Sequence, residues 1–153
     1  MTVRVDRLRH LITVLEAVKE REQPFYLYGW MDENHPDCGT TACACGWAAM
    51  DETFKAEGLG LVPSTYPFRG GTYNGKLWRS LKLAFGDSIE FNAAMNFFGL
   101  AADDAVKLFH PNGYTDPRDV CAVIRRVRKV IVEAGGDPDA PDLMGPAQIP
   151  TLA

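Results

Sequence analysis

HPDCGTTACACGWA, residues 35–48, holds three of the four cysteines of the chain within eight residues. Thr40 or Thr41 can cap the first free amides of a helix, and the residues that follow predict a helix that ends near Lys55. Gly46 inside this helix costs about 1 kcal/mol relative to alanine. Because the surrounding alanines keep the helix narrow, we expect another backbone segment to approach Gly46 closely.

Apolar residues at three- and four-residue steps extend the helical pattern along the chain. Residues 58–76 are rich in proline and glycine and predict a long ordered loop or a small hairpin. The fold class expected from this pattern is mainly α: a single compact domain of five to six helices over residues 1–136, with a loosely held, proline-rich C-terminal tail at 137–153. The expected helices cover residues 4–21, 40–55, 77–85, 88–98, 103–109 and 117–134.

Composition and charge limit the classes of partner and compartment. The chain has 153 residues and a formal charge of -4 at pH 7, so it has no overall attraction to nucleic acid or anionic membranes. No apolar run approaches the roughly 20 residues of a membrane span, and the charged N-terminus is not a signal peptide. We therefore expect a soluble, cytoplasmic protein that does not enter membranes, with cysteines that are free or metal-bound.

The cysteine cluster has a structural interpretation and two alternatives in which its thiols form bonds, a zinc site and a disulfide. Small buried thiols on a narrow helix explain it most simply. His35, Cys38, Cys43 and Cys45 also have the number and softness of ligands that a tetrahedral zinc site requires. Against zinc, residues two apart on a helix point about 200° apart, so Cys43 and Cys45 share an ion only if the helix starts later. A labile disulfide between Cys38 and Cys43 is the other alternative.

A catalytic thiol is the remaining interpretation of the cluster. Cys43 or Cys45 at a helix N-terminus would have a lowered pKa, because the helix dipole and free amides stabilise a thiolate. His110 is the candidate base, and Asn112 or Asp116 is the candidate residue that orients it. The separation is shorter than in papain-like enzymes, and local signatures of this kind do not transfer between families.

The pattern Cys38-Gly-Thr-x-Ala-Cys-x-x-Gly-Trp-Ala48 resembles the CGTxACxxGW signature of small uncharacterised proteins of bacteria and their phages, especially actinobacterial ones. The resemblance includes the aromatic segment 25–30 and the stretches 94–100 and 105–109, about two-thirds of the chain. That signature usually has alanine at the position of Cys45, which shifts weight to the other two cysteines of the cluster. The resemblance implies a genomic context of phages or mobile elements, without an established activity.

A basic cluster on the last predicted helix is the candidate partner-binding surface. The alternative is a solvated face that complements the C-terminal helix dipole. Residues 93–109 could form a helix-turn-helix, but Asp103 and Asp104 would repel DNA, so sequence-specific DNA binding is not expected. The basic cluster consists of Arg118, Arg125, Arg126, Arg128 and Lys129.

No paired carboxylates, H-E-x-x-H motif, phosphate loop or serine-hydrolase motif occurs in the sequence. We therefore expect a small accessory or regulatory protein of phage or mobile-element type that needs no cofactor. It would act by binding another macromolecule, with protein as the expected partner. The alternative is a cysteine-centred site, either structural zinc or a thiol-dependent enzyme.

Overall fold

The computed structural model describes residues 2–35, 39–64, 70–73 and 75–152. Its helices are α1 (Val5–Glu20), α2 (Ala44–Met50), α3 (Glu52–Ala56), α4 (Glu90–Phe98), α5 (Ala102–Phe109), the 3-10 helix η1 (Pro111–Gly113) and α6 (Val120–Glu133). Its strands are β1 (Met31–His35), β2 (Gly39–Ala42), β3 (Leu59–Pro63), β4 (Gly70–Tyr73), β5 (Lys76–Phe85) and β6 (Ser88–Ile89). Over these ranges the strands form one six-stranded antiparallel sheet in the order β2-β1-β5-β3, and β4 and β6 also pair with β5.

The expectation of a mainly α fold is wrong, and the largest error lies in β5. Residues 77–85 were expected to be helical, because Leu77 and Leu81 are four residues apart. The same spacing also places two residues on one face of a strand. Leu83 and Phe85 continue the two-residue period, and β5 becomes the central strand that pairs with β1, β3, β4 and β6. The protein is therefore an α/β protein.

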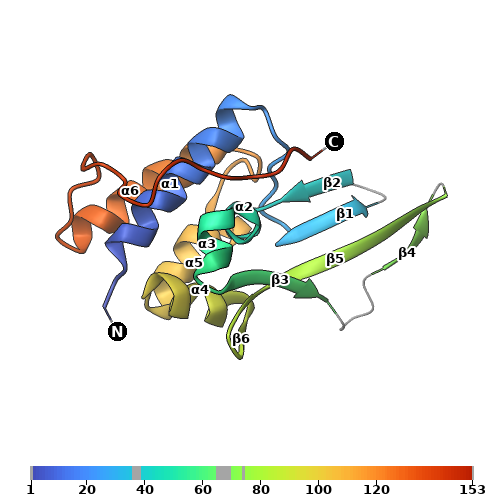
Figure 1. Cartoon of the computed structure of the whole chain (residues 1–153), viewed down its shortest axis with the longest axis horizontal. Helices are drawn as coiled ribbons and strands as arrows, with labels where there is room; N and C mark the ends of the chain where they lie inside the picture. The colour runs from blue at the N-terminus through green and yellow to red at the C-terminus, as the bar shows by residue number, and fades with distance from the viewer. Residues whose placement is uncertain (1, 36–38, 65–69, 74, 153) are drawn as a thin grey trace.

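The sheet also includes two regions that were expected to be loop or helix start. Residues 31–35 and 39–42 pair as β1 and β2, so the helix of the cysteine cluster begins later than predicted, at Ala44. Residues 58–76 contribute β3 and β4, and β4 pairs with the beginning of β5 as a hairpin. In Figure 1 this hairpin extends away from the helices.

The helices pack at one end of the molecule and connect to the sheet through α2 and α4. Figure 1 shows α1 and α6 side by side, and these two helices are in contact. Helix α2 contacts β3 and β5, and α4 contacts β5. At this junction Phe54, Phe97 and Phe98 are fully buried and meet edge to face, with ring centroids 5.0–6.0 Å apart. The helix predicted at 4–21 is confirmed as α1.

A buried histidine joins α1 to the C-terminal segment, residues 137–152. In Figure 1 this segment crosses the helices and ends near β2. His10 is fully buried; its Nε2 lies 2.8 Å from Asp51 Oδ2 and its Nδ1 lies 2.8 Å from Asp142 Oδ2. Asp51 Oδ1 also accepts a hydrogen bond from the amide of Gln148 at 2.7 Å. The segment expected to be a loosely held tail thus has polar anchors in the core.

Both ring nitrogens of His10 face carboxylate oxygens, so both can donate only when the imidazole is protonated. Burial opposes the positive charge, but the hydrogen bonds to Asp51 and Asp142 outweigh it and raise the pKa of His10. Burial likewise opposes the negative charges, yet the hydrogen bonds that Asp51 and Asp142 accept lower the pKa of both carboxyls. The folded protein therefore stabilises an ionised cluster.

We expect the free energy of unfolding to decrease as the pH rises above about 6.5, through the raised pKa of His10. The reason is that the folded protein binds this proton more tightly than the unfolded chain. Asp51 and Asp142 add the opposite dependence only under acid conditions, below about pH 4, because their pKa values are lowered. Urea unfolding between about pH 6 and pH 8, below the range in which the raised pKa values of Cys43 and Cys45 add a slope of the same sign, measures the effect, and His10→Gln should remove it. An identical slope in both proteins would contradict this assignment.

Candidate functional site

Cys43 is held at the junction of β2 and α2. It is the N-cap residue of α2, and its Sγ accepts a hydrogen bond from the amide of Gly46 at 3.4 Å. Its own amide donates to the carbonyl of Trp30 at 3.2 Å. A Cβ atom on Gly46 would lie 1.8 Å from that same carbonyl oxygen. The close backbone approach expected at Gly46 is therefore confirmed, and it places the start of α2 directly against the segment before β1.

The two thiols of the cluster that the structure describes, Cys43 and Cys45, are buried and not activated. Cys43 is 2% exposed and Cys45 is completely buried. Burial raises the pKa of Cys43 to about 11, although the amide of Gly46 acts in the opposite direction. Burial also raises the pKa of Cys45 well above its ordinary value. Both groups are thus neutral thiols at neutral pH, which is the state expected for cysteines that serve packing.

The zinc hypothesis depends on a residue outside the described ranges, Cys38. Of its other ligands, His35 lies on β1 with its ring 5.2 Å from that of Trp78, while Cys43 and Cys45 lie at the start of α2. Within the described ranges, no group of three or more His, Cys, Asp or Glu side chains is arranged so that it could hold a metal ion. Cys43 is a free thiol in the structure, and Cys38, its partner in the predicted disulfide, lies outside the described residues. The zinc site stays a prediction.

Three of the proposed catalytic residues line one cavity of about 330 Å³, which we call the aromatic hollow. Cys43 comes from the start of α2, His110 from the end of α5 and Asn112 from η1. Cys45 and Asp116, the other two proposed catalytic residues, are not among the residues that line it. The other walls are Leu27, Tyr28, Gly29, Trp30, Phe91, Phe109 and Pro111.

The hydrogen bonding of His110 does not suit a general base for Cys43. Its Nδ1 accepts a hydrogen bond from the amide of Asn112 at 3.1 Å, and its ring stacks on Phe91 with centroids 5.9 Å apart. A neutral imidazole that accepts at Nδ1 carries its proton on Nε2, so no lone pair is left to take the proton of a thiol. In a catalytic triad the arrangement is the reverse: Nδ1 donates and Nε2 accepts.

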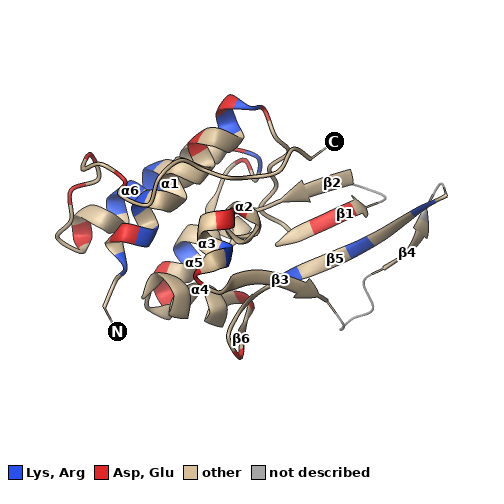
Figure 2. Cartoon of the chain, viewed as in Figure 1, with Lys and Arg blue, Asp and Glu red and all other residues tan. Residues whose placement is uncertain are grey.

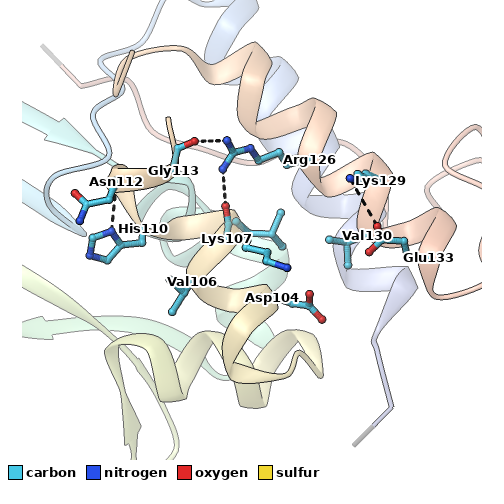
Figure 3. A pocket seen from close by; sticks show the side chains of 11 residues that line it. Asp104, Val106, Lys107, His110, Asn112, Gly113, Arg126, Lys129, Val130 and Glu133 are labelled. Carbon is cyan, nitrogen blue, oxygen red and sulfur yellow. Dashed lines mark hydrogen bonds and ion pairs between the residues drawn. The ribbon is translucent and has the colours of Figure 1, made fainter. Parts of the chain in front are cut away.

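Two further cavities share walls with the aromatic hollow. The first, the helix hollow of about 540 Å³ between α5, η1 and α6, shares His110 and Asn112 (Figure 3). The second, the carboxylate hollow of about 220 Å³, shares Tyr28, Gly29 and Trp30. The additional walls of the helix hollow are Asp104, Val106, Lys107, Leu108, Gly113, Arg126, Lys129, Val130 and Glu133. Those of the carboxylate hollow are Asp32, His35, Ser64, Ser80 and Leu81.

Each residue of the predicted basic cluster has a partner within the chain. Figure 2 shows basic positions on α6 and acidic positions on the segment that follows it. The partners are the ring of Tyr26 for Arg118, Asp119 for Arg125, the ring of Tyr114 for Arg126, Asp139 for Arg128 and Glu133 for Lys129.

Arg126 shows most clearly how α6 uses a basic side chain for structure. It donates to the backbone carbonyls of Lys107 and Gly113, as Figure 3 shows, and so connects α6 to α5 and η1. In contrast, the side chains of Arg125 and Lys129 are 70% and 77% exposed. These two residues are the candidates if the cluster binds a partner.

Sequence reasoning missed Asp32, because residues 32–38 were expected to be loop. Met31 is followed by four polar residues, so this stretch has no apolar–polar alternation that could have indicated a strand. Over the residues that the structure describes, no helix is long and apolar enough to cross a membrane. Comparison of the chain with protein-family models, curated proteins and solved structures finds no match, so the resemblance to the CGTxACxxGW proteins stays a prediction.

Proposed function

We propose that the protein is a non-enzymatic accessory or regulatory protein that binds an extended polypeptide segment at the three hollows. The observation that supports this proposal is that the hollows share walls, through His110 and Asn112 on one side and through residues 28–30 on the other. A small molecule would fill one hollow, whereas an extended chain places successive side chains in adjoining pockets.

The middle of this surface has the properties of an anchoring pocket. Tyr28 is 61% exposed although it is a large aromatic residue, and it borders both the aromatic and the carboxylate hollow. Exposed aromatic rings beside a pocket are enriched at protein-binding sites. Trp30 meets Phe91 edge to face at 5.1 Å and forms a rigid wall. We therefore expect an apolar side chain of the partner to enter the aromatic hollow.

The charges around the helix hollow favour a polypeptide over a nucleic acid. Asp104 and Glu133 line it together with Lys107, Lys129 and Arg126, whose guanidinium already donates to the backbone carbonyls of Lys107 and Gly113. A phosphate backbone requires a predominantly positive surface, which this mixture does not provide. A polypeptide can match both signs with its own side chains. We further propose that the protein acts in the cytoplasm, in the phage or mobile-element setting that the signature implies.

Selection from a random-peptide display library tests the proposal. We expect enriched peptides that share an apolar position and bind the wild-type protein reversibly in fluorescence titrations. Tyr28→Ala should weaken binding by about tenfold or more, because the ring borders two hollows. Leu143→Ala is the matched control, since Leu143 is 91% exposed and lines none of the three hollows. Failure to enrich peptides, or equal effects of the two substitutions, would contradict the proposal.

A thiol-dependent enzyme is the second candidate function, because Cys43, His110 and Asn112 line the same hollow. Alkylation by iodoacetamide, followed for each cysteine by mass spectrometry, separates the candidates. For a binding protein we expect Cys121, which is only partly buried, to react before Cys43, whose pKa is about 11. Rapid labelling of Cys43 at neutral pH that is lost in His110→Ala would instead support the enzyme.

A further inference from the structure

Asp32 on β1 carries a nearly buried carboxylate with an incomplete set of partners. The residue is 8% exposed, and it pairs with Ser80 of β5 across the sheet. Ser80 Oγ donates a hydrogen bond to Asp32 Oδ1. The other oxygen, Oδ2, lies beside Gly29, where a Cβ atom would approach it to 2.3 Å. Glycine at this position thus provides the space that Oδ2 occupies.

Within the described part of the chain, no cation forms an ion pair with Asp32 and no donor forms a hydrogen bond to Oδ2. The adjacent Glu33, by contrast, forms an ion pair with Arg79 at 2.6 Å. Lys82 lies two residues beyond Ser80 on the same face of β5, but it forms no ion pair with Asp32 either. No fully buried side-chain oxygen among the described residues lacks a hydrogen-bond partner, so Oδ2 keeps some access to solvent. A carboxylate that is largely shielded from water and has no cation is still unfavourable for folding. Groups that cost stability in this way are characteristic of binding sites.

The surroundings of Oδ2 suit an organic cation. Asp32 lines the carboxylate hollow together with the aromatic residues Tyr28, Trp30 and His35. The faces of tyrosine and tryptophan rings attract ammonium and guanidinium groups, most strongly when these groups are desolvated. The hydroxyl groups of Ser64 and Ser80, which line the same hollow, can accept further N–H groups.

An organic cation fits this hollow better than a metal ion. Over the described ranges, no third metal-ligating side chain joins Asp32 and a neighbour such as His35 at one point. An ammonium or guanidinium group needs only one carboxylate, and the carbon chain that carries it can pack on the aromatic rings. The hollow therefore has the composition of a site for a lysine or arginine side chain.

We propose that the carboxylate hollow binds the side-chain cation of a lysine or arginine in the polypeptide partner, with Asp32 Oδ2 as its acceptor. This inference rests on the proposed function and names the chemistry of the partner. Since residues 28–30 form a wall common to both hollows, the cation would lie close in sequence to the apolar residue in the aromatic hollow. The specificity of the protein would then be for an apolar residue beside a basic one.

Peptides enriched by display on the wild-type protein provide the first test. We expect a lysine or arginine at a fixed distance from the shared apolar position. Replacing it by norleucine should weaken binding to the wild-type protein by about tenfold, and should have little effect on binding to Asp32→Asn. Glu33→Gln is the matched control, because it removes the same charge from the neighbouring position of β1; there the norleucine effect should remain. Peptides that depend on Tyr28 but lack a basic position would overturn this inference and leave the proposed function intact.

Butylammonium and butylguanidinium chlorides test the hollow without a peptide. Titration of the wild-type protein should produce a saturable change in tryptophan fluorescence, since Trp30 lines the hollow. Sodium chloride at equal ionic strength, and titration of Asp32→Asn, should produce none. The ratio of the two affinities shows whether lysine or arginine is preferred. No saturable change with either salt would overturn the proposal.

Stability of the unliganded variants provides a third readout that needs no ligand. We expect the urea midpoint of Asp32→Asn to be higher than that of the wild-type protein, because the substitution removes a largely buried charge that has no cation, keeps the shape of the side chain and keeps an oxygen that can accept from Ser80. Glu33→Gln should not raise the midpoint, since Glu33 already has a partner in Arg79. A lower midpoint for Asp32→Asn would mean that the carboxylate already has a favourable partner within the chain, and would overturn the proposal.

Discussion

Replacing Gly46 with alanine is expected to destabilise the protein by about 3 kcal/mol, the upper end of the usual range for overpacking. The added Cβ would lie 1.8 Å from the carbonyl oxygen of Trp30 and 2.9 Å from Cβ of Ala42. Neither contact involves the end of a flexible side chain, so backbone must move. Alanine improves helix propensity by about 1 kcal/mol, which does not offset a clash of this kind. Urea unfolding measures the difference.

Gly60→Ala is the control for this substitution. Gly60 lies in β3, and no heavy atom would come within 4 Å of an added Cβ. We expect its stability to stay within about 0.5 kcal/mol of wild type. If the two variants were equally stable, α2 would not press on the segment at Trp30. The geometry that holds Cys43 in the aromatic hollow would then be incorrect.

Replacing Asp51 with alanine is expected to cost about 3–5 kcal/mol, the range for removing one member of a buried ion pair. The substitution leaves His10 without its fully buried partner and removes the side chain that caps α3 at the amide of Phe54. It also removes the acceptor for the amide of Gln148. We therefore expect the tail to detach. Urea unfolding measures the loss of stability, and hydrogen exchange at the amide of Gln148 measures the detachment.

Asp139→Ala separates this effect from the loss of any acidic group near the tail. The side chain of Asp139 is 77% exposed and forms an ion pair with Arg128. An exposed pair of this type contributes at most about 1 kcal/mol, so we expect a small change in stability and unchanged exchange at Gln148. Equal effects of the two substitutions would show that the buried cluster does not hold the tail.

The binding proposal and the stability of the fold involve different carboxylates. Asp51 has a full set of partners, so its loss should destabilise the protein, whereas Asp32 has an incomplete set, so its neutralisation should stabilise it. The opposite signs expected for two buried aspartates are a direct test of which one is retained for structure and which for a ligand.

Local sequence signals correctly predicted the elements whose conformation depends on residues close in the sequence and not on partners from elsewhere in the fold. The amphipathic stripe of α1 occurs as expected, and so does Gly99 at the end of α4, which adopts a left-handed conformation with φ of 68°. The need for a close backbone approach at Gly46 could also be predicted, because glycine in a helix requires a compensating reason. These inferences depend on one segment and its immediate geometry.

The candidate site could be predicted only in part. Cys43, His110 and Asn112 were named from residue chemistry, and they do line one hollow. Their roles could not be predicted, since the pKa of Cys43 depends on burial and the acceptor role of His110 depends on a local backbone amide. Asp32 was missed because a strand that begins in a loop-like composition gains its structure from the neighbouring β5.

The sequence by itself determined the amphipathic helix α1 and the close backbone contact at Gly46, because these follow from the spacing and size of neighbouring residues. Only the tertiary structure decided that residues 77–85 form the central strand, since a four-residue spacing of leucines satisfies both periods until strand partners are present. It also decided which carboxylates have partners. Asp51 and Asp142 both contact the ring of His10, although Asp142 lies near the far end of the chain. No local sequence pattern encodes contacts between residues so far apart in the chain.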